Sequence, residues 1–162
     1  VIGVIVVVPT GLSIVSMHFV DPGIVLMLLG LVWIADTAAY FSGRAFGRHK
    51  LAPSISPGKT WEGAAGALAA TFVYAALCAS LWPPLAGVVE KYGWLPYLSL
   101  GGLLCIVSIE GDLFESSSKR NAGAKDSGTL LPGHGGVLDR IDSITSTLPM
   151  AALIFHFFAR SA

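Results

Sequence analysis

The sequence predicts an all-α protein, a polytopic transmembrane helix bundle of about five spans that forms a single domain over residues 1–162. Two features of the composition support this prediction. Hydrophobic residues make up 54% of the chain, and the mean hydropathy is +0.72. Charged residues make up only 12%, whereas a soluble domain averages about 25%, so a bilayer is the natural solvent. The net charge of zero argues against a nucleic-acid-binding protein.

Five apolar stretches are candidates for membrane spans, because a span needs about 20 mostly apolar residues. They cover residues 1–19, 22–43, 63–82, 95–111 and 143–160. The first stretch has no basic residues ahead of its apolar run, so we do not interpret it as a signal peptide. The fourth is short and ends in Glu110 and Asp112, which makes its boundary the weakest of the five.

Positive charge is concentrated in two of the connections between these spans. Eight of the ten Lys and Arg residues lie there, namely Arg44, Arg48, Lys50, Lys59, Lys119, Arg120, Lys125 and Arg140. The positive-inside rule places both connections on the cytoplasmic side, and their alternation along the chain agrees with this. We therefore expect the two connections to meet in space and to form a catalytic site at the cytoplasmic face.

The segment SISPGKTWEG precedes the third span. Its Gly-Lys-Thr run resembles the end of a P-loop, but Pro53 stands where that motif requires glycine, which excludes an NTPase. Thr60 is suited to cap the following helix, with Glu62 in the first turn. Free N–H groups at this helix start, together with Lys59, suit an anion. The alternative is a capped helix at the membrane interface, anchored by Trp61.

Asp36 lies inside the otherwise apolar second span. A carboxylate at that depth should face a polar cavity or a partner rather than lipid. Asp36, Tyr40, Gly43 and Gly47 have the 4-3-4 spacing of one helix face, and the glycines permit close approach of a helix or a substrate. Pairing of Asp36 with a buried cation or hydroxyl is the alternative.

The segment from Glu110 to Ser143 is rich in charge and glycine. Asp139 and Asp142 are three residues apart at the start of the fifth span, where a helix N-terminus favours acidic groups or bound phosphate. Several carboxylates without a Cys or His cluster suit Mg²⁺, which keeps waters and takes phosphate oxygens from its substrate. His134 is either a loop hydrogen-bonding residue or a donor to a phosphate or a nucleotide. Together these groups indicate phosphoryl or nucleotidyl transfer to a lipid phosphate.

Four short motifs in this segment occur in a fixed order: Ser116-Ser117-Ser118-Lys119-Arg120, Lys125-Asp126, His134-Gly135-Gly136 and Asp139-Arg140-Ile141-Asp142. The set resembles the phosphatidate cytidylyltransferase family, also called CDP-diacylglycerol synthases. SPGKTWEG is similar to that family's Ser-Pro-Lys-Lys-Thr-x-Glu-Gly segment, and the match covers about 33–66 and 110–144. Two residues depart from the family pattern: Ser118 replaces an apolar residue, and Gly58 replaces a lysine, which removes one cation.

The resemblance implies that a phosphate oxygen of phosphatidic acid attacks the α-phosphorus of CTP, giving CDP-diacylglycerol and pyrophosphate. It implies a Mg²⁺ cofactor, with a second cation left open. The metal ligands would be Asp112, Asp139 and Asp142. The other catalytic groups would be cations that neutralise phosphates: Lys119, Arg120, Lys125 and Arg140. The substrate-binding residues would be Lys59, Thr60, His134, Gly135, Gly136, Asp36 and Asp126.

The resemblance also carries expectations about the whole protein. Because family members have more N-terminal spans, we expect the chain to be the C-terminal catalytic portion of a longer enzyme. We expect an integral protein of a bacterial cell membrane, in contact with membrane lipids, with its active site facing the cytoplasm. A homodimer is implied as well, and the pair Gly43 and Gly47 could serve either that interface or a helix contact inside one protomer.

Three other functions are compatible with an acidic site in a membrane bundle. A CDP-alcohol phosphotransferase shares the substrate class, but its Asp-Gly-x-x-Ala-Arg run is absent. A transporter would use Asp36 in its pathway, but the internal repeats common in transporters are absent. An inactive or truncated scaffold is the third alternative.

Overall fold

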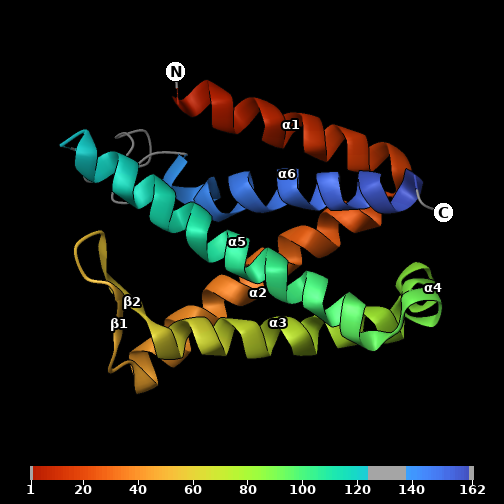
Figure 1. The fold of residues 1–162 in the computed structure, drawn as a ribbon, viewed down its shortest axis with the longest axis horizontal. Helices are drawn as coiled ribbons and strands as arrows, with labels where there is room; N and C mark the ends of the chain where they lie inside the picture. The colour runs from red at the N-terminus through yellow and green to blue at the C-terminus, as the bar shows by residue number, and fades with distance from the viewer. Residues whose placement is uncertain (1, 124–137, 161–162) are drawn as a thin grey trace.

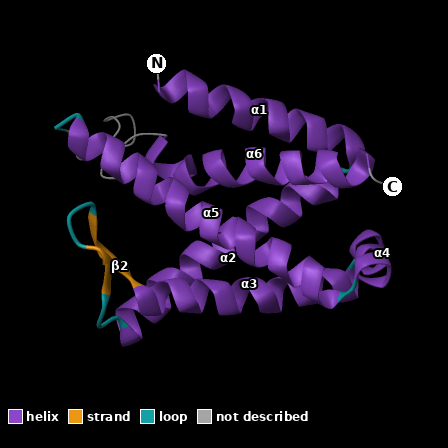
Figure 2. Ribbon diagram, viewed as in Figure 1, coloured by secondary structure: helices purple, strands orange, loops and turns teal. Residues whose placement is uncertain are grey.

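The protein is a helical bundle with one small β-hairpin, as the computed structural model shows (Figure 1). The structure describes residues 2–123 and 138–160. Helices dominate this part of the chain (Figure 2). The described elements are α1 (Ile2–Val20), α2 (Pro22–Phe46), β1 (Lys50–Ala52), β2 (Ser56–Thr60), α3 (Trp61–Leu81), α4 (Pro83–Tyr92), α5 (Trp94–Asn121) and α6 (Leu138–Arg160).

Three of the helices, α2, α3 and α5, are long and apolar enough to cross a membrane. The apolar parts of α1 and α6, Val4–Val20 and Ile141–Phe157, are shorter. Large apolar side chains also point outward: Leu26 is 70% exposed and Leu95 is 82% exposed, which suits a lipid surround. The prediction of a helical membrane protein is confirmed, while the number of five spans stays a prediction.

Three elements differ from the sequence-based expectation. The connection before α3 forms an antiparallel hairpin, in which Lys50 is opposite Thr60. Residues 83–92, expected to be a connection, form α4, and Pro83 at its start fits the first turn of a helix. The fourth predicted span was expected to end at 111, whereas α5 continues to Asn121. Hydropathy could not detect this extension because its residues are polar.

Side-chain pairs one turn apart support the polar end of α5. Ser116 Oγ donates a hydrogen bond to Asp112 Oδ1 at 3.3 Å, and Lys119 Nζ lies 3.4 Å from Glu115 Oε1. Such pairs at i and i+4 stabilise a helix by about 0.2–0.5 kcal/mol each. The charged residues expected in a loop after 111 therefore lie on a rigid helix as far as Asn121.

Helices α2 and α3 pack closely because small residues face each other. Thr60 is buried and caps α3, since its Oγ1 accepts a hydrogen bond from Gly63 N at 3.1 Å. A methyl group added at Gly43 would lie 3.0 Å from the same Thr60 oxygen, and one at Gly47 would lie 2.8 Å from Thr60 Cγ2. The two glycines thus serve a contact inside one protomer, and the homodimer stays a prediction.

The described parts of the two basic connections lie at the same end of the bundle. Figure 1 shows the hairpin and the C-terminal end of α5 together on the left, with α4 at the opposite end. An ion pair between Lys59 of β2 and Asp112 of α5 joins them directly. The expected meeting of the two connections is therefore present, while the side of the membrane on which they lie stays a prediction.

Replacing Gly63 by Ala should destabilise the bundle. The new methyl group would lie 2.9 Å from the carbonyl oxygen of Ala39 in α2, so backbone atoms must move apart. Overpacking of this kind costs about 1–3 kcal/mol. Thermal unfolding in detergent should show a lower midpoint for Gly63→Ala. Gly87→Ala in α4 is the matched control, because a methyl group there meets nothing within 4 Å. Equal midpoints for the two variants would contradict this packing.

Candidate functional site

A polar cavity of about 590 Å³ opens where the hairpin meets the helix ends. Six elements contribute to its walls: α2, β1, β2, α3, α5 and α6. Its polar and charged lining residues are Asp36, Tyr40, Arg44, Ser56, Lys59, Thr60, Asp112, Asp142 and Ser143. The cavity therefore combines groups from both basic connections with the acidic residue of the second span.

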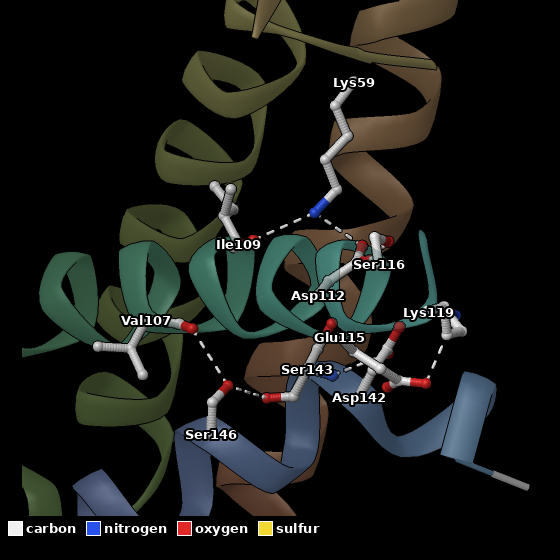
Figure 3. Close-up of polar contacts among 10 residues, drawn as sticks. All are labelled: Lys59, Val107, Ile109, Asp112, Glu115, Ser116, Lys119, Asp142, Ser143 and Ser146. Atoms are coloured by element: carbon white, nitrogen blue, oxygen red, sulfur yellow. Dashed lines mark hydrogen bonds and ion pairs between the residues drawn. The ribbon is translucent and has the colours of Figure 1, made fainter. Parts of the chain in front are cut away.

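An ion pair lies at the centre of this arrangement (Figure 3). Lys59 Nζ is 2.7 Å from Asp112 Oδ2, and it also donates a hydrogen bond to the carbonyl oxygen of Ile109 at 3.1 Å. The second carboxylate oxygen of Asp112 accepts the hydrogen bond from Ser116. The Lys59 and Asp112 side chains are only 22% and 30% exposed, so water screens this pair less than it screens a surface pair.

Three carboxylates from three different helices line the cavity: Asp36 of α2, Asp112 of α5 and Asp142 of α6. Asp142 Oδ1 accepts a hydrogen bond from the backbone N–H of Ser143 at 2.8 Å. Lys59 lies at ion-pair distance from Asp112. Negative charge gathered at one place in a site that limits solvation favours binding of a cation.

The donor set is compatible with a hard cation such as Mg²⁺. Among the side chains that the structure describes, which do not include that of Asp139, no three acidic, His or Cys groups are close enough to hold a metal by themselves. Mg²⁺ does not require such a group, because it is usually bound through one or two carboxylates, waters and substrate phosphates. Asp112 and Asp142 supply carboxylate oxygens of this kind on neighbouring helices.

The hairpin that carries Lys59 is fixed at its base. The Glu62 carboxylate lies 2.7 Å from His49 Nδ1 and accepts a hydrogen bond from His49 N at 3.2 Å. The backbone N–H of Trp61 donates to the carbonyl oxygen of His49 at 3.0 Å. These contacts join the start of β1 to the start of α3. No role for His49 could be predicted from the sequence, because its partner is thirteen residues away.

Several predicted site residues lie together, and others do not. Asp36, Lys59, Thr60, Asp112 and Asp142 all line the cavity. Lys119 and Arg120 lie in the last turn of α5 and are not part of the cavity lining, and Lys119 pairs with Glu115. The functional roles assigned to these residues stay predictions.

The remaining predicted site residues cannot be placed in the same way. Asp139 and Arg140 belong to the first turn of α6, but their side chains are outside the described part of the structure. Five predicted residues lie outside the described residues altogether: Lys125, Asp126, His134, Gly135 and Gly136. Conversely, Ser56, Arg44 and Ser143 line the cavity and were not among the predicted site residues.

Comparison with known proteins identifies the family. The sequence model of the cytidylyltransferase family matches residues 1–158. The chain belongs to the cytidylyltransferase family. Among curated members, the phosphatidate cytidylyltransferase of Brucella suis is 52% identical over 136 residues, which cover 83% of this chain and 46% of that protein. The enzyme of the same name from Pseudomonas aeruginosa is 47% identical over 132 residues, covering 82% and 47%. That from Thermotoga maritima is 38% identical over 130 residues, covering 80% and 48%.

This cytidylyltransferase-family chain spans about half the length of the curated relatives it matches. The family model covers both segments that form the cavity, since it extends over residues 1–158. The resemblance to phosphatidate cytidylyltransferases that the ordered motifs indicated is thereby confirmed.

The ion pair between Lys59 and Asp112 should be measurable as a coupling energy. We expect Lys59→Met and Asp112→Asn each to lower the free energy of unfolding by about 1–3 kcal/mol, a range between that of exposed and buried pairs. The double variant should lose less than the sum, by about 0.5 kcal/mol or more. Denaturant titration in mixed micelles provides the measurement.

Ser116→Ala is the control for this double-mutant cycle, because it removes only the 3.3 Å hydrogen bond to Asp112. It should cost about 1 kcal/mol or less. Strict additivity of the two single changes would show that the ion pair does not couple the hairpin to α5.

Proposed function

We propose that this chain transfers the cytidylyl group of CTP to phosphatidic acid, giving CDP-diacylglycerol and pyrophosphate. The observation that carries the proposal is the cavity in which Lys59 and three carboxylates meet at one end of an apolar bundle. The relatives are named phosphatidate cytidylyltransferases, and they match most of this chain. Family membership favours cytidylyl transfer over the CDP-alcohol phosphotransferase and transporter alternatives.

The transfer requires mainly that the two substrates are positioned and that their negative charge is neutralised. The phosphate monoester of phosphatidic acid is largely ionised at neutral pH, so its oxygen can attack without a strong general base. Two anionic substrates must approach each other, and cations near the cavity reduce their repulsion. Lys59 can exchange its contact with Asp112 for a contact with a substrate phosphate, which would free a carboxylate oxygen as a ligand.

We propose Asp112, Asp142 and Asp139 as the residues that hold Mg²⁺. When bound, this ion would neutralise negative charge on the phosphates and orient them. Asp112 and Asp142 line the cavity. Asp139 is included because the family motif contains it, three residues before Asp142 on the same helix.

We propose that the lipid substrate reaches the cavity from the side of the bundle. The outer faces of α2 and α3 carry exposed apolar side chains such as Phe41 and Trp61, which are 63% and 61% exposed. These side chains suit the region where acyl chains meet headgroups. We propose that this end of the bundle faces the cytoplasm, where CTP is available, because most basic residues are concentrated in its two connections.

Purified protein in detergent should release pyrophosphate when CTP, phosphatidic acid and Mg²⁺ are supplied together. Asp112→Asn and Asp139→Asn should each lower the rate by about 100-fold or more, the size of effect seen when one electrostatic stabiliser is removed from an active site. Incorporation of radiolabelled cytidylyl groups into lipid is the direct measurement. Glu90→Gln is the matched control, because Glu90 lies on α4 and does not line the cavity. Full activity of the Asp112 variant would contradict the proposal.

Removal of divalent cations should also stop the reaction. The expected result with excess chelator is loss of pyrophosphate release, and addition of Mg²⁺ should restore it, since hard cations bind carboxylate and phosphate oxygens. Thermal unfolding measured in the same buffers distinguishes loss of catalysis from loss of folding. Undiminished turnover in chelator would rule out the proposed role of the carboxylates.

A further inference from the structure

The described part of the cavity wall contains two cations, and they differ in their partners. Lys59 lies 2.7 Å from the carboxylate of Asp112, so its charge is already compensated. Arg44 Nη1 donates a hydrogen bond to the hydroxyl of Tyr40 at 3.1 Å, and that hydroxyl is neutral. Among the described residues of the cavity lining, Arg44 is therefore the cation for which the structure shows no ion pair with a carboxylate.

The position of Arg44 separates its charge from the carboxylates. Asp36, Tyr40 and Arg44 are each four residues apart, so they follow one face of α2, and all three line the cavity. Eight residues correspond to about 12 Å along the helix axis. Asp36 thus lies about two turns before Arg44, which is in the last turn of α2.

The geometry of the guanidinium leaves most of its donors available. Arginine has five N–H donors, and the contact with Tyr40 uses one of them. The planar group can present two parallel N–H bonds to one phosphate, which a lysine cannot do. The hydrogen bond from Arg44 to Tyr40 joins two exposed side chains of the cavity lining and gives the guanidinium a neutral partner one turn earlier on α2.

We propose that Arg44 binds a phosphate group of a substrate at the mouth of the cavity and that Tyr40 positions it through its hydroxyl. This inference rests on the proposed function for the identity of the substrates. The ligand chemistry is an anionic phosphate, whether it belongs to the nucleotide or to the lipid headgroup. Arg44 is a substrate-binding residue in this assignment, and Tyr40 is a positioning residue.

Steady-state kinetics of the purified chain in mixed micelles test the assignment, with CTP and phosphatidic acid varied separately. Arg44→Gln should raise KM for one of the two substrates by about 10-fold or more, as expected for a charge-assisted hydrogen bond, with a smaller change in kcat. Arg44→Lys should recover part of the loss, because it keeps the charge but not the planar donors. Tyr40→Phe should raise KM for the same substrate by a smaller factor, about 2- to 5-fold.

The matched control is Arg48→Gln. Arg48 belongs to the same basic connection but does not line the cavity, so both KM values should stay unchanged. A selective change for CTP assigns Arg44 to the nucleotide, and a selective change for phosphatidic acid assigns it to the lipid. Unchanged KM values for Arg44→Gln, or equal effects of Arg48→Gln, would overturn the inference. Thermal unfolding of each variant verifies that it is folded.

The inference remains testable if the wild-type chain shows no turnover, an outcome that would count against the proposed function instead. Equilibrium titration with CTP and with short-chain phosphatidic acid then replaces the kinetics. Weaker binding of either ligand by Arg44→Gln, with unchanged binding by Arg48→Gln, supports the assignment. Equal binding by wild type and both variants refutes it.

Discussion

The ion pair between Lys59 and Asp112 is the contact on which the rest of the site depends. It joins a hairpin that follows the second helix to a helix that begins more than thirty residues later, at Trp94. Partly buried charges are stabilising only when their geometry is good and their other hydrogen-bonding groups are satisfied. Here the N···O distance is 2.7 Å, Lys59 also donates to Ile109, and Ser116 donates to Asp112. This contact joins the two segments at the wall of the cavity.

The surrounding scaffold fixes the position of Lys59 through its neighbour in the chain. Thr60 is buried at the start of α3, where its hydroxyl caps the helix, and Gly43 in α2 and Gly47 just after it leave space for it. Successive residues of a strand point to opposite sides, so burial of Thr60 constrains the direction of Lys59. The contact between His49 and Glu62 secures the other strand. These contacts therefore fix the backbone position from which the flexible Lys59 side chain extends.

The features predicted correctly from sequence are those with local causes. Apolar runs identified the long helices, and the Thr60 cap followed from its residue type and position. The distribution of Lys and Arg indicated that two distant connections share one end of the bundle. Three features were missed because their causes are not local. The hairpin depends on cross-strand pairing, α4 lacks a span-length apolar run, and the polar end of α5 is held by pairs such as Lys119 with Glu115. The sequence does not indicate which carboxylate Lys59 contacts, because the segment from Glu110 to Ser143 contains six acidic residues.

Helix α5 is unbroken, so it fixes how far apart its residues lie along the helix axis. Its 28 residues correspond to about 42 Å, which exceeds a hydrocarbon thickness of about 30 Å. Asp112 and Lys119 lie on this helix, about 10 Å apart along its axis. A thicker or thinner membrane can tilt α5, but it cannot change the distance between Asp112 and Lys119 along the helix. The depths of Asp112 and of the last turn of α5 in the membrane are therefore coupled, because both belong to one continuous helix.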